Sequence, residues 1–442
     1  MSDHARTPIG IWIESPRGAQ WANQGMTRLL GFIVEGLAQA GSHVFRIVVT
    51  DDIRSEAEAD FADLVATAGE DYSFHSPQDM GQTAADFDDL ARFADRHVPV
   101  TAWISLFPNQ LGIKLLSKPV ASIFPDAIGL AYHDFTEGAW ALDGPPAAWR
   151  DRVSQALPHI TRFITFSDHV ARDQVQGLFG VPPDRVTVIP HAPPTLDGIL
   201  PFIRDGQRTE ASRYAAACLL RRHAARHGPA YLANFPFEHV RYAAVSTQDR
   251  VTKNIRVVVD AIDELVRAQF ESFKLIMTAQ LHYGATWSPT PGAIARRLLH
   301  LDALSMPDLP RDVHAAFYHC AEIAIHPSVF EGGRGTFPYY EAISVGTPCL
   351  MAHGPHVAEL LIDTPELAGS MFDPFDAVGL AALMLAASAG RAELVALQRA
   401  TYDRLRQRTW RQVALEYAAA ALAPASTGIS ATTLPVSARI SA

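Results

Sequence analysis

The 442-residue sequence has only three cysteines, Cys218, Cys320 and Cys349, and their spacing fits neither a disulfide framework nor a metal site. An odd number of widely separated thiols is typical of a reducing compartment. The sequence also lacks an apolar run of membrane-spanning length, and no basic segment followed by an apolar one stands at its start. We therefore expect a cytoplasmic protein without a signal peptide.

Further absences exclude classes of function. The formal net charge of -10 leaves no excess of basic residues of the kind that a general nucleic-acid-binding protein carries. No Gly-x-Gly-x-x-Gly turn occurs, which argues against a dinucleotide-dependent dehydrogenase. Asp86-Phe87-Asp88 has the form of a metal motif but lies in a helix-like stretch, and His223 with His227 lacks a third ligand. We expect no bound metal and no cofactor.

What the sequence does contain is 48% hydrophobic residues, enough to bury two cores in a chain of this length. Short apolar runs alternate with helix-like stretches, a pattern that predicts parallel sheets covered by helices. We expect a first domain at residues 1–195 and a second at residues 241–423. The predicted strands of the first domain are 9–13, 44–50, 100–105, 120–124, 128–133, 163–167 and 186–190. Those of the second domain are 242–247, 274–278, 323–326 and 349–351.

Two other segments lie outside these domains. Residues 196–240 form a linker with a helical insertion, and residues 424–442, rich in Ser, Thr and Ala, read as a flexible tail. The basic helix predicted over 211–226 has an apolar side, made by Tyr214, Ala217, Cys218 and Leu220. This side either packs against the protein or rests on an anionic membrane surface.

The segment 325–348 is the most informative one, because its pattern is strand, glycine loop, short helix and turn. Gly332, Gly333 and Gly335 let the backbone approach a ligand, and the amides that open the following helix suit a diphosphate. Glu341 in that helix is placed to accept hydrogen bonds from ribose hydroxyls, with Glu331 nearer the sugar. The alternative is an ordinary turn with solvated glutamates.

Three weaker patterns accompany this segment. Arg250 and Lys253 lie between a predicted strand and a helix, where they either grip a phosphate or are solvated loop cations. His133 and Asp134 follow another predicted strand at its carboxyl end, where open α/β sheets bind ligands, although a histidine there is often merely hydrogen-bonded. Gly25 opens a helix after the first strand, or is an ordinary loop glycine.

Together these residues resemble the retaining glycosyltransferases of the GT-B fold, family four (glycosyl transferases group 1), mannosyltransferases among them. The hallmark is Pro-Ser-x-x-Glu-Gly-x-Gly-x-Pro-x-x-Glu-Ala with a later Gly-Thr-Pro. Here residues 327–342 read PSVFEGGRGTFPYYEA and 346–348 read GTP. One departure is that Glu331 and Glu341 are ten positions apart rather than eight, which implies a longer glycine loop.

The resemblance implies two Rossmann-like α/β domains facing each other across a cleft, with the acceptor on the side of residues 1–195 and the nucleotide-sugar donor held by residues 241–423. It also implies transfer of a hexose from a nucleotide diphosphate sugar to an acceptor hydroxyl with retention of configuration. Arg250 and Lys253 would neutralise the departing diphosphate, and His133 would contact the sugar beside Asp134. The candidate catalytic residues are His133, Arg250, Lys253 and Glu331, and the candidate donor-binding residues are Gly25, Asp134, Gly332, Gly333, Arg334, Gly335, Thr336 and Glu341.

The sequence leaves several alternatives open. Mannose from GDP-mannose is our first expectation for the donor, followed closely by UDP-linked hexoses. The acceptor is a saccharide or a lipid-linked molecule, with a role in bacterial polysaccharide or glycoconjugate synthesis at the inner face of the membrane. A non-catalytic nucleotide-sugar-binding scaffold and a sugar-nucleotide epimerase of the same fold remain as rival functions.

Overall fold

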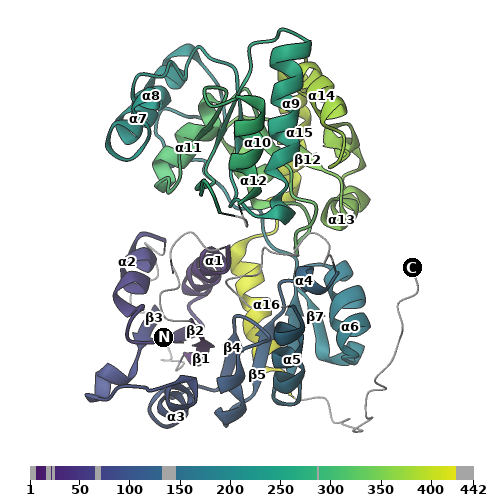
Figure 1. Cartoon of the computed structure of the whole chain (residues 1–442). Coiled ribbons are helices and arrows are strands. Elements are labelled where there is room, and N and C mark those ends of the chain that lie inside the picture. Colours follow the sequence, from purple (N-terminus) through teal and green to yellow (C-terminus); the bar gives the residue numbers. More distant parts are fainter. Residues whose placement is uncertain are drawn as a thin grey trace. The chain divides into compact units, whose positions relative to one another are not determined.

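The computed structural model describes residues 6–15, 21, 25–64, 71–131, 146–285 and 288–424. The chain forms two compact units (Figure 1). Unit 1 comprises Met1–Ala127, Ala147–Pro190 and Trp410–Ala442, and unit 2 comprises Ile128–Pro146 and His191–Thr409. Each unit is built around its own parallel sheet, as the alternating sequence pattern predicts.

Unit 1 contains a seven-stranded parallel sheet in the order β3-β2-β1-β4-β5-β6-β7. The order reverses between β1 and β4, so the loops after these two strands diverge at one point of the sheet edge. The strands are β1 (Thr7–Trp12), β2 (His43–Val48), β3 (Tyr72–His75), β4 (Ala102–Ser105), β5 (Val120–Ile123), β6 (Arg162–Thr165) and β7 (Val186–Val188).

The sequence analysis was wrong about one strand. Residues Ile128–Ala131, inside the strand predicted over 128–133, form the short helix α4, and positions 132 and 133 lie outside the described residues. A short apolar run does not distinguish strand from helix by its periodicity. The sheet also leaves no place for such a strand, since β5 pairs directly with β6.

The helix that ends the described chain, α16 (Trp410–Leu422), packs on α1 (Gly25–Ala40) in unit 1, although it lies within the range predicted for the second domain. Trp410 stacks on Phe32 with the ring centroids 4.5 Å apart. Gly36 permits this approach, because a Cβ atom there would collide with the Trp410 carbonyl. The other described helices of four or more residues in this part are α2 (Arg54–Leu64), η2 (Pro77–Met80), α3 (Phe87–His97), η3 (Leu111–Leu115), α5 (Pro146–Ala156) and η6 (Val170–Gln176).

Unit 2 contains a six-stranded parallel sheet in the order β10-β9-β8-β11-β12-β13, which reverses between β8 and β11. Its central strands are buried at every position, as expected of a parallel sheet covered on both faces. The strands are β8 (Tyr242–Val245), β9 (Lys274–Met277), β10 (Ala303–Ser305), β11 (Ile323–His326), β12 (Cys349–Ala352) and β13 (Met371–Phe372).

Helices cover both faces of this sheet and enclose two buried apolar clusters. The helix α7 (Glu210–His227) of the predicted insertion buries Ala217 and Leu220 in one cluster, so part of its predicted apolar side faces the protein, while Tyr214 is exposed. The remaining described helices are α8 (Ala230–Ala233), η8 (Val251–Lys253), α9 (Ile255–Asp263), η9 (Glu264–Ala268), α10 (Pro289–Arg297), α11 (Arg311–Cys320), α12 (Phe337–Ser344), α13 (Pro355–Asp363), η10 (Pro365–Ser370), α14 (Ala377–Ala389) and α15 (Arg391–Leu405).

Within the described residues, no single helix has the length and apolar composition needed to cross a membrane. The helices α14 and α15 meet these criteria only as a pair, and they are bent by 92° where they join.

Candidate functional site

The candidate site lies at the carboxyl edge of the unit 2 sheet, where the strand order reverses between β8 and β11. The loop after β8 leads through Arg250 to Lys253, and the loop after β11 carries Glu331 and the three glycines. In open α/β sheets the diverging loops at such a point leave a crevice that binds ligands. Two segments that are some 80 positions apart in the sequence are therefore brought together there.

Three side chains meet at this point. The Lys253 ammonium lies 2.5 Å from Oε1 of Glu331, and Nε2 of His326 lies 3.0 Å from the same oxygen. His326 is the last residue of β11 and is almost fully buried. Burial raises the pKa of Glu331, but the Lys253 charge and the His326 hydrogen bond outweigh burial and hold that pKa well below its usual range. The site thus contains an ionised carboxylate in contact with a cation.

The loop that carries the two predicted cations is held in place by its own polar residues. The buried Asp249 carboxylate accepts hydrogen bonds from the hydroxyls of Ser288 and, at 2.5 Å, of Thr290. Asn254 has a left-handed φ of 47°, and its Nδ2 donates to the Pro374 carbonyl at 2.7 Å. These anchors fix the short turn η8 that presents Lys253.

Arg250 differs from Lys253 in its surroundings. Its side chain is exposed, and among the described residues it makes no hydrogen bond or ion pair. A guanidinium in this position remains available to a phosphate oxygen.

The glycine loop 332–335 runs into α12. Gly335 has a φ of +67°, and a Cβ atom there would lie 2.9 Å from the Tyr340 hydroxyl, so the loop requires glycine at this position. Its amide donates to the His356 carbonyl at 3.0 Å. Thr336 caps α12, because its hydroxyl accepts a hydrogen bond from the Tyr339 amide at 3.2 Å. The predicted order of strand, loop and short helix is what the structure contains.

Arg334 and Glu341, two of the residues predicted to bind the donor, are held by their surroundings within unit 2. Nε of Arg334 lies 3.0 Å from Glu359 and Nη1 lies 3.5 Å from Asp363, both on α13. Glu341 lies in α12 and is 1% exposed. Their roles toward a donor therefore remain predictions, since Arg334 links the loop to α13 and Glu341 is enclosed by the protein.

The Gly-Thr-Pro turn after α12 has a structural reason for its glycine. Gly346 has a φ of +85°, and a Cβ atom there would collide with the Gly206 carbonyl from the segment before α7. The Thr347 hydroxyl donates to the Tyr318 carbonyl at 2.6 Å. Part of the sequence hallmark thus serves backbone packing.

The remaining predicted residues lie in other parts of the chain. His133 and Asp134 fall outside the described residues. Gly25 is the first residue of α1, and no atom lies within 4 Å of the position that its Cβ would take. None of the described residues of unit 1 therefore requires a glycine there.

Two histidines of this region had no role in the sequence analysis. His326 stands directly before the Pro-Ser of the hallmark, which is the only sequence pattern that could have indicated it. His356 on α13 is 1% exposed, with its ring 6.3 Å from that of His326 and with neither ring nitrogen hydrogen-bonded to a described residue. Burial lowers the pKa of His356 to about 3, so this ring is neutral.

Among the residues with described positions, no group of three or more His, Cys, Asp or Glu side chains has a geometry that could hold a metal ion.

No protein-family model matches the sequence, and no curated protein matches it either. Solved structures are similar over nearly the whole chain. Sucrose-phosphate synthase from Thermosynechococcus elongatus matches 93% of this chain and 98% of its own, with a TM-score of 0.66 and 15% identity. Anabaena HepE in complex with UDP-glucose matches 94% and 100%, with a TM-score of 0.64 and 13% identity. The trehalose 6-phosphate synthase from Burkholderia multivorans matches 94% and 98%, with a TM-score of 0.56 and 11% identity.

Likeness at this level of identity concerns the fold. Two α/β units, each with a parallel sheet, match the GT-B fold of these structures, which confirms the fold class predicted from the sequence.

Proposed function

We propose that this protein is a retaining glycosyltransferase that moves a hexose from a nucleotide diphosphate sugar to an acceptor hydroxyl. The observation that carries the proposal is the contact of Lys253 with Glu331 at the point where the unit 2 strand order reverses. The hard step of the reaction is departure of an anionic diphosphate, and a preformed cation beside glycine amides stabilises that developing charge. The unengaged Arg250 adds a second cation.

In the proposed reaction, the bond between the anomeric carbon and the diphosphate oxygen breaks, and its electron pair leaves with the diphosphate. Lys253, Arg250 and the amides of Gly332, Gly333 and Gly335 bind that oxyanion. The acceptor oxygen then bonds to the anomeric carbon, and its proton passes to the departing phosphate. Glu331 orients Lys253 before the donor arrives. As the resemblance implies, Glu331 then contacts the sugar of the bound donor.

The other predicted residues keep the roles that the resemblance implies. Glu341 binds the ribose hydroxyls, while Arg334 and Thr336 shape the loop around the diphosphate. His133 contacts the transferred sugar and Asp134 orients it, and Gly25 lets the loop before α1 approach the phosphate.

For the donor we propose GDP-mannose first and UDP-linked hexoses next. The similar HepE structure contains UDP-glucose, which makes this compound part of any test. We further propose that neither a metal nor another cofactor takes part, that the acceptor is a saccharide or a lipid-linked molecule of polysaccharide or glycoconjugate synthesis, and that the enzyme works in the cytoplasm at the inner membrane face. The exposed arginines of α7 and Tyr214 are the groups that would contact lipid.

The test is a panel of nucleotide sugars, each assayed with purified protein for thermal stabilisation and for release of the nucleoside diphosphate, with and without acceptors. We expect one donor to stabilise the protein and release its diphosphate, and Lys253→Ala and Glu341→Ala to impair both. Stabilisation without release would indicate a scaffold, and conversion of the donor without acceptor would indicate an epimerase. If no donor stabilises the protein, the assigned site is wrong.

A further inference from the structure

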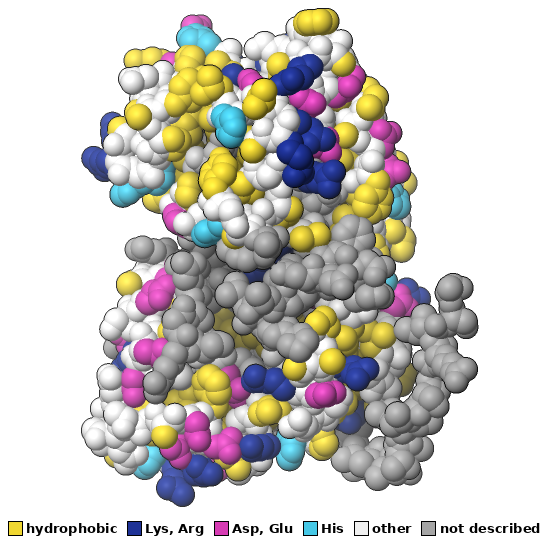
Figure 2. All heavy atoms as spheres, in the orientation of Figure 1, with side chains coloured by type: hydrophobic (Ala, Val, Ile, Leu, Met, Phe, Trp, Pro, Cys, Tyr) yellow, Lys and Arg dark blue, Asp and Glu magenta, His cyan; other side chains and the backbone are white. Residues whose placement is uncertain are grey.

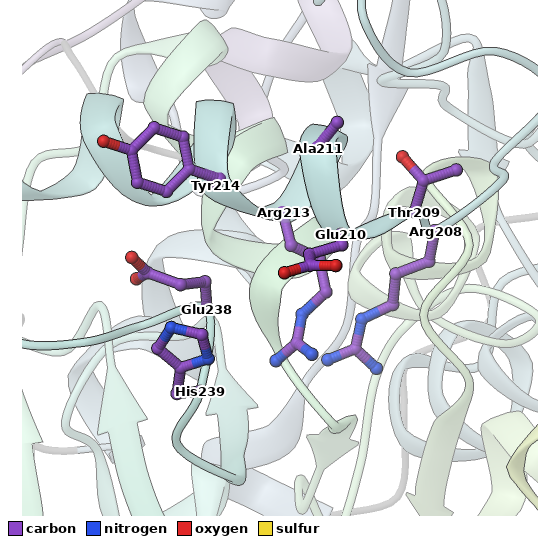
Figure 3. A pocket seen from close by; sticks show the side chains of 8 residues that line it. All are labelled: Arg208, Thr209, Glu210, Ala211, Arg213, Tyr214, Glu238 and His239. Carbon is purple, nitrogen blue, oxygen red and sulfur yellow. The ribbon is translucent and has the colours of Figure 1, made fainter.

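Unit 2 contains a cavity of about 910 Å³ beside the start of α7 (Figure 3). The residues that line it all lie in the predicted linker and helical insertion, just before α7, in α7 and in the loop before β8, and they are Arg208, Thr209, Glu210, Ala211, Arg213, Tyr214, Glu238 and His239. This lining shares no residue with the proposed donor site.

The cavity lies at the amino edge of the unit 2 sheet. Glu238 and His239 come just before β8, and Nη2 of Arg208 donates to the carbonyl of Cys320, just before β11, at 3.0 Å. The candidate donor site lies where β8 and β11 end. Because the strands are parallel, the two sites are at opposite edges of the same sheet.

Two guanidinium groups lie next to each other at the floor of the cavity. Figure 3 shows the side chains of Arg208 and Arg213 extending in the same direction, with their charged ends side by side. Arg208 pairs with Glu322 at 3.1 Å. Arg213 forms no hydrogen bond or ion pair through its side chain with any described residue, and its buried Nε has no acceptor. Burial, followed by the Arg208 charge, lowers the pKa of Arg213.

Glu322 does not balance the positive charge of this cluster. A third arginine, Arg391, donates from Nε to the Glu322 carbonyl at 3.0 Å, and burial followed by the Arg208 charge lowers its pKa to about 9. The carboxylate of Glu322 is shared between Arg208 and the Ser388 hydroxyl. The Glu322 carboxylate is therefore engaged by Arg208, and its charge offsets only part of the burial and repulsion that lower the pKa of Arg213.

The two carboxylates that line the cavity are not ion-paired with Arg213. Glu238 is paired with Arg221 at 2.6 Å, and Glu210 is exposed at the first turn of α7. Figure 2 shows other basic side chains on the face of unit 2 that it draws. Arg256 of α9 and Arg297 of α10 differ from Arg213, because both pair with Asp260, the latter at 2.8 Å. Among the described residues, Arg213 of the cavity has no such ion pair.

We propose that this cavity binds a small phosphate monoester, such as a sugar phosphate, at a site separate from the donor site. The planar guanidinium group of Arg213, with that of Arg208 beside it, suits the oxygens of one phosphate, whose charge offsets the positive charge that Glu322 leaves unbalanced. The cavity extends beyond these groups to Tyr214, which is 59% exposed and offers a ring on which the organic part of the ligand packs. Binding stabilises unit 2 and leaves the candidate donor site, where the strand order reverses between β8 and β11, unoccupied.

The experiment is a calorimetric titration of the full chain with inorganic phosphate, glucose 6-phosphate and, as a neutral match, glucose. We expect saturable binding of both phosphates, with the sugar phosphate bound more tightly, and none of glucose. Arg213→Gln should weaken binding of the sugar phosphate at least about tenfold. The matched control Arg222→Gln removes an exposed arginine from the same helix and should leave the affinity unchanged.

Two further variants separate this site from the donor site and from a folding defect. Lys253→Ala should keep sugar-phosphate binding, since Lys253 lies at the other sheet edge. Tyr214→Ala should weaken the sugar phosphate to the level of inorganic phosphate. The proposal is overturned if the wild type binds neither phosphate, if Arg213→Gln binds as the wild type does, or if Lys253→Ala abolishes the binding. A cooperative thermal unfolding transition of Arg213→Gln, measured without ligand, shows that the variant is folded.

Discussion

Each of the two sheets has a glutamate at the point where its strand order reverses, and the two carboxylates are used differently. In unit 1 this residue is Glu14, just after β1 and almost fully buried. Its carboxylate accepts hydrogen bonds from the Gly112 amide at 2.5 Å, the Leu111 amide at 3.1 Å and the Trp12 indole at 3.1 Å. Burial, which these bonds only partly offset, raises the pKa of Glu14.

In unit 2 the corresponding residue is Glu331, whose partners are the side chains of Lys253 and His326. Its pKa is held well below the usual range, although burial alone would raise it. Glu14 also has a cation nearby, Arg152 at 3.7 Å, but its hydrogen bonds come from two backbone amides and an indole, which hold it between two loops. Glu331 is bonded directly to a lysine side chain, which can move to a phosphate. The type of partner, and not the topological position, distinguishes a binding site from a structural link.

The largest effect is expected from Lys253→Ala. We expect kcat/KM for diphosphate release to fall about 10²- to 10³-fold, because the cation that stabilises the departing charge is lost. The assay is release of the nucleoside diphosphate from whichever donor the panel identifies.

The matched control for that variant is Lys274→Ala. Lys274 is also ion-paired, with Asp302 at 2.7 Å, but it begins β9 at the opposite edge of the same sheet. We expect its removal to leave kcat/KM unchanged. Equal losses of kcat/KM in the two variants would mean that the reaction does not take place where the strand order reverses between β8 and β11.

The second test exchanges the two glutamates for glutamine. Glu331→Gln should lower kcat/KM about 100-fold while changing the free energy of unfolding by less than about 1 kcal/mol, because a partly exposed ion pair contributes little to stability. Glu14→Gln should instead lower the free energy of unfolding of unit 1 by about 1–3 kcal/mol, because one of the buried backbone donors loses its acceptor.

Urea unfolding and diphosphate release measured on both variants give the result. If Glu14→Gln loses activity at full stability, the carboxylate of unit 1 is also a ligand-binding group and the contrast between the units fails.

The sequence predicted the parts of the site that depend on local pattern. Apolar runs indicate strands, and glycines before a capped helix indicate a tight loop, so the parallel sheets and the loop around Gly335 were foreseeable. The meeting of Lys253 with Glu331 follows once the two strands are neighbours, but strand order is a long-range property.

Features that depend on packing were not predictable in this way. α4 was mistaken for a strand because its apolar run is too short to show a period. His356 reaches His326 only because α13 packs beside the end of β11, and no spacing in the sequence announces that contact. Asp249 finds its partners at the start of α10, about 40 positions later. Such contacts are properties of the assembled sheet edge.

A third, smaller effect separates glycines that the protein itself requires from one that it does not. Gly335→Ala should destabilise unit 2 by about 1–2 kcal/mol, since φ is +67° there and the Tyr340 hydroxyl lies close. Gly25→Ala should leave the stability of unit 1 unchanged, because no atom of a described residue lies near its Cβ position. If the loop before α1 approaches the donor phosphate, the same variant loses about tenfold in kcat/KM, as expected for about 1.4 kcal/mol of binding energy. Full activity of Gly25→Ala would remove this residue from the donor site.

The smallest effect is the opposite pH dependence of the two carboxyl groups. Glu331 has a folded-state pKa well below its ordinary value of 4.5, so its contribution to stability is present above pH 4.5 and decreases as the pH falls toward that lower pKa. Glu14 has a folded-state pKa above 4.5, so its ionised form is disfavoured in the folded state and the wild type gains stability as the pH falls through that pKa. The free energy of unfolding is measured as the pH is lowered from 7 to 3. Over this range the value for the wild type should fall relative to that of Glu331→Gln and should rise relative to that of Glu14→Gln, each by on the order of 1 kcal/mol. Slopes of the same sign would show that both carboxylates have the same kind of partner, and the distinction between a structural and an exchangeable glutamate would be lost.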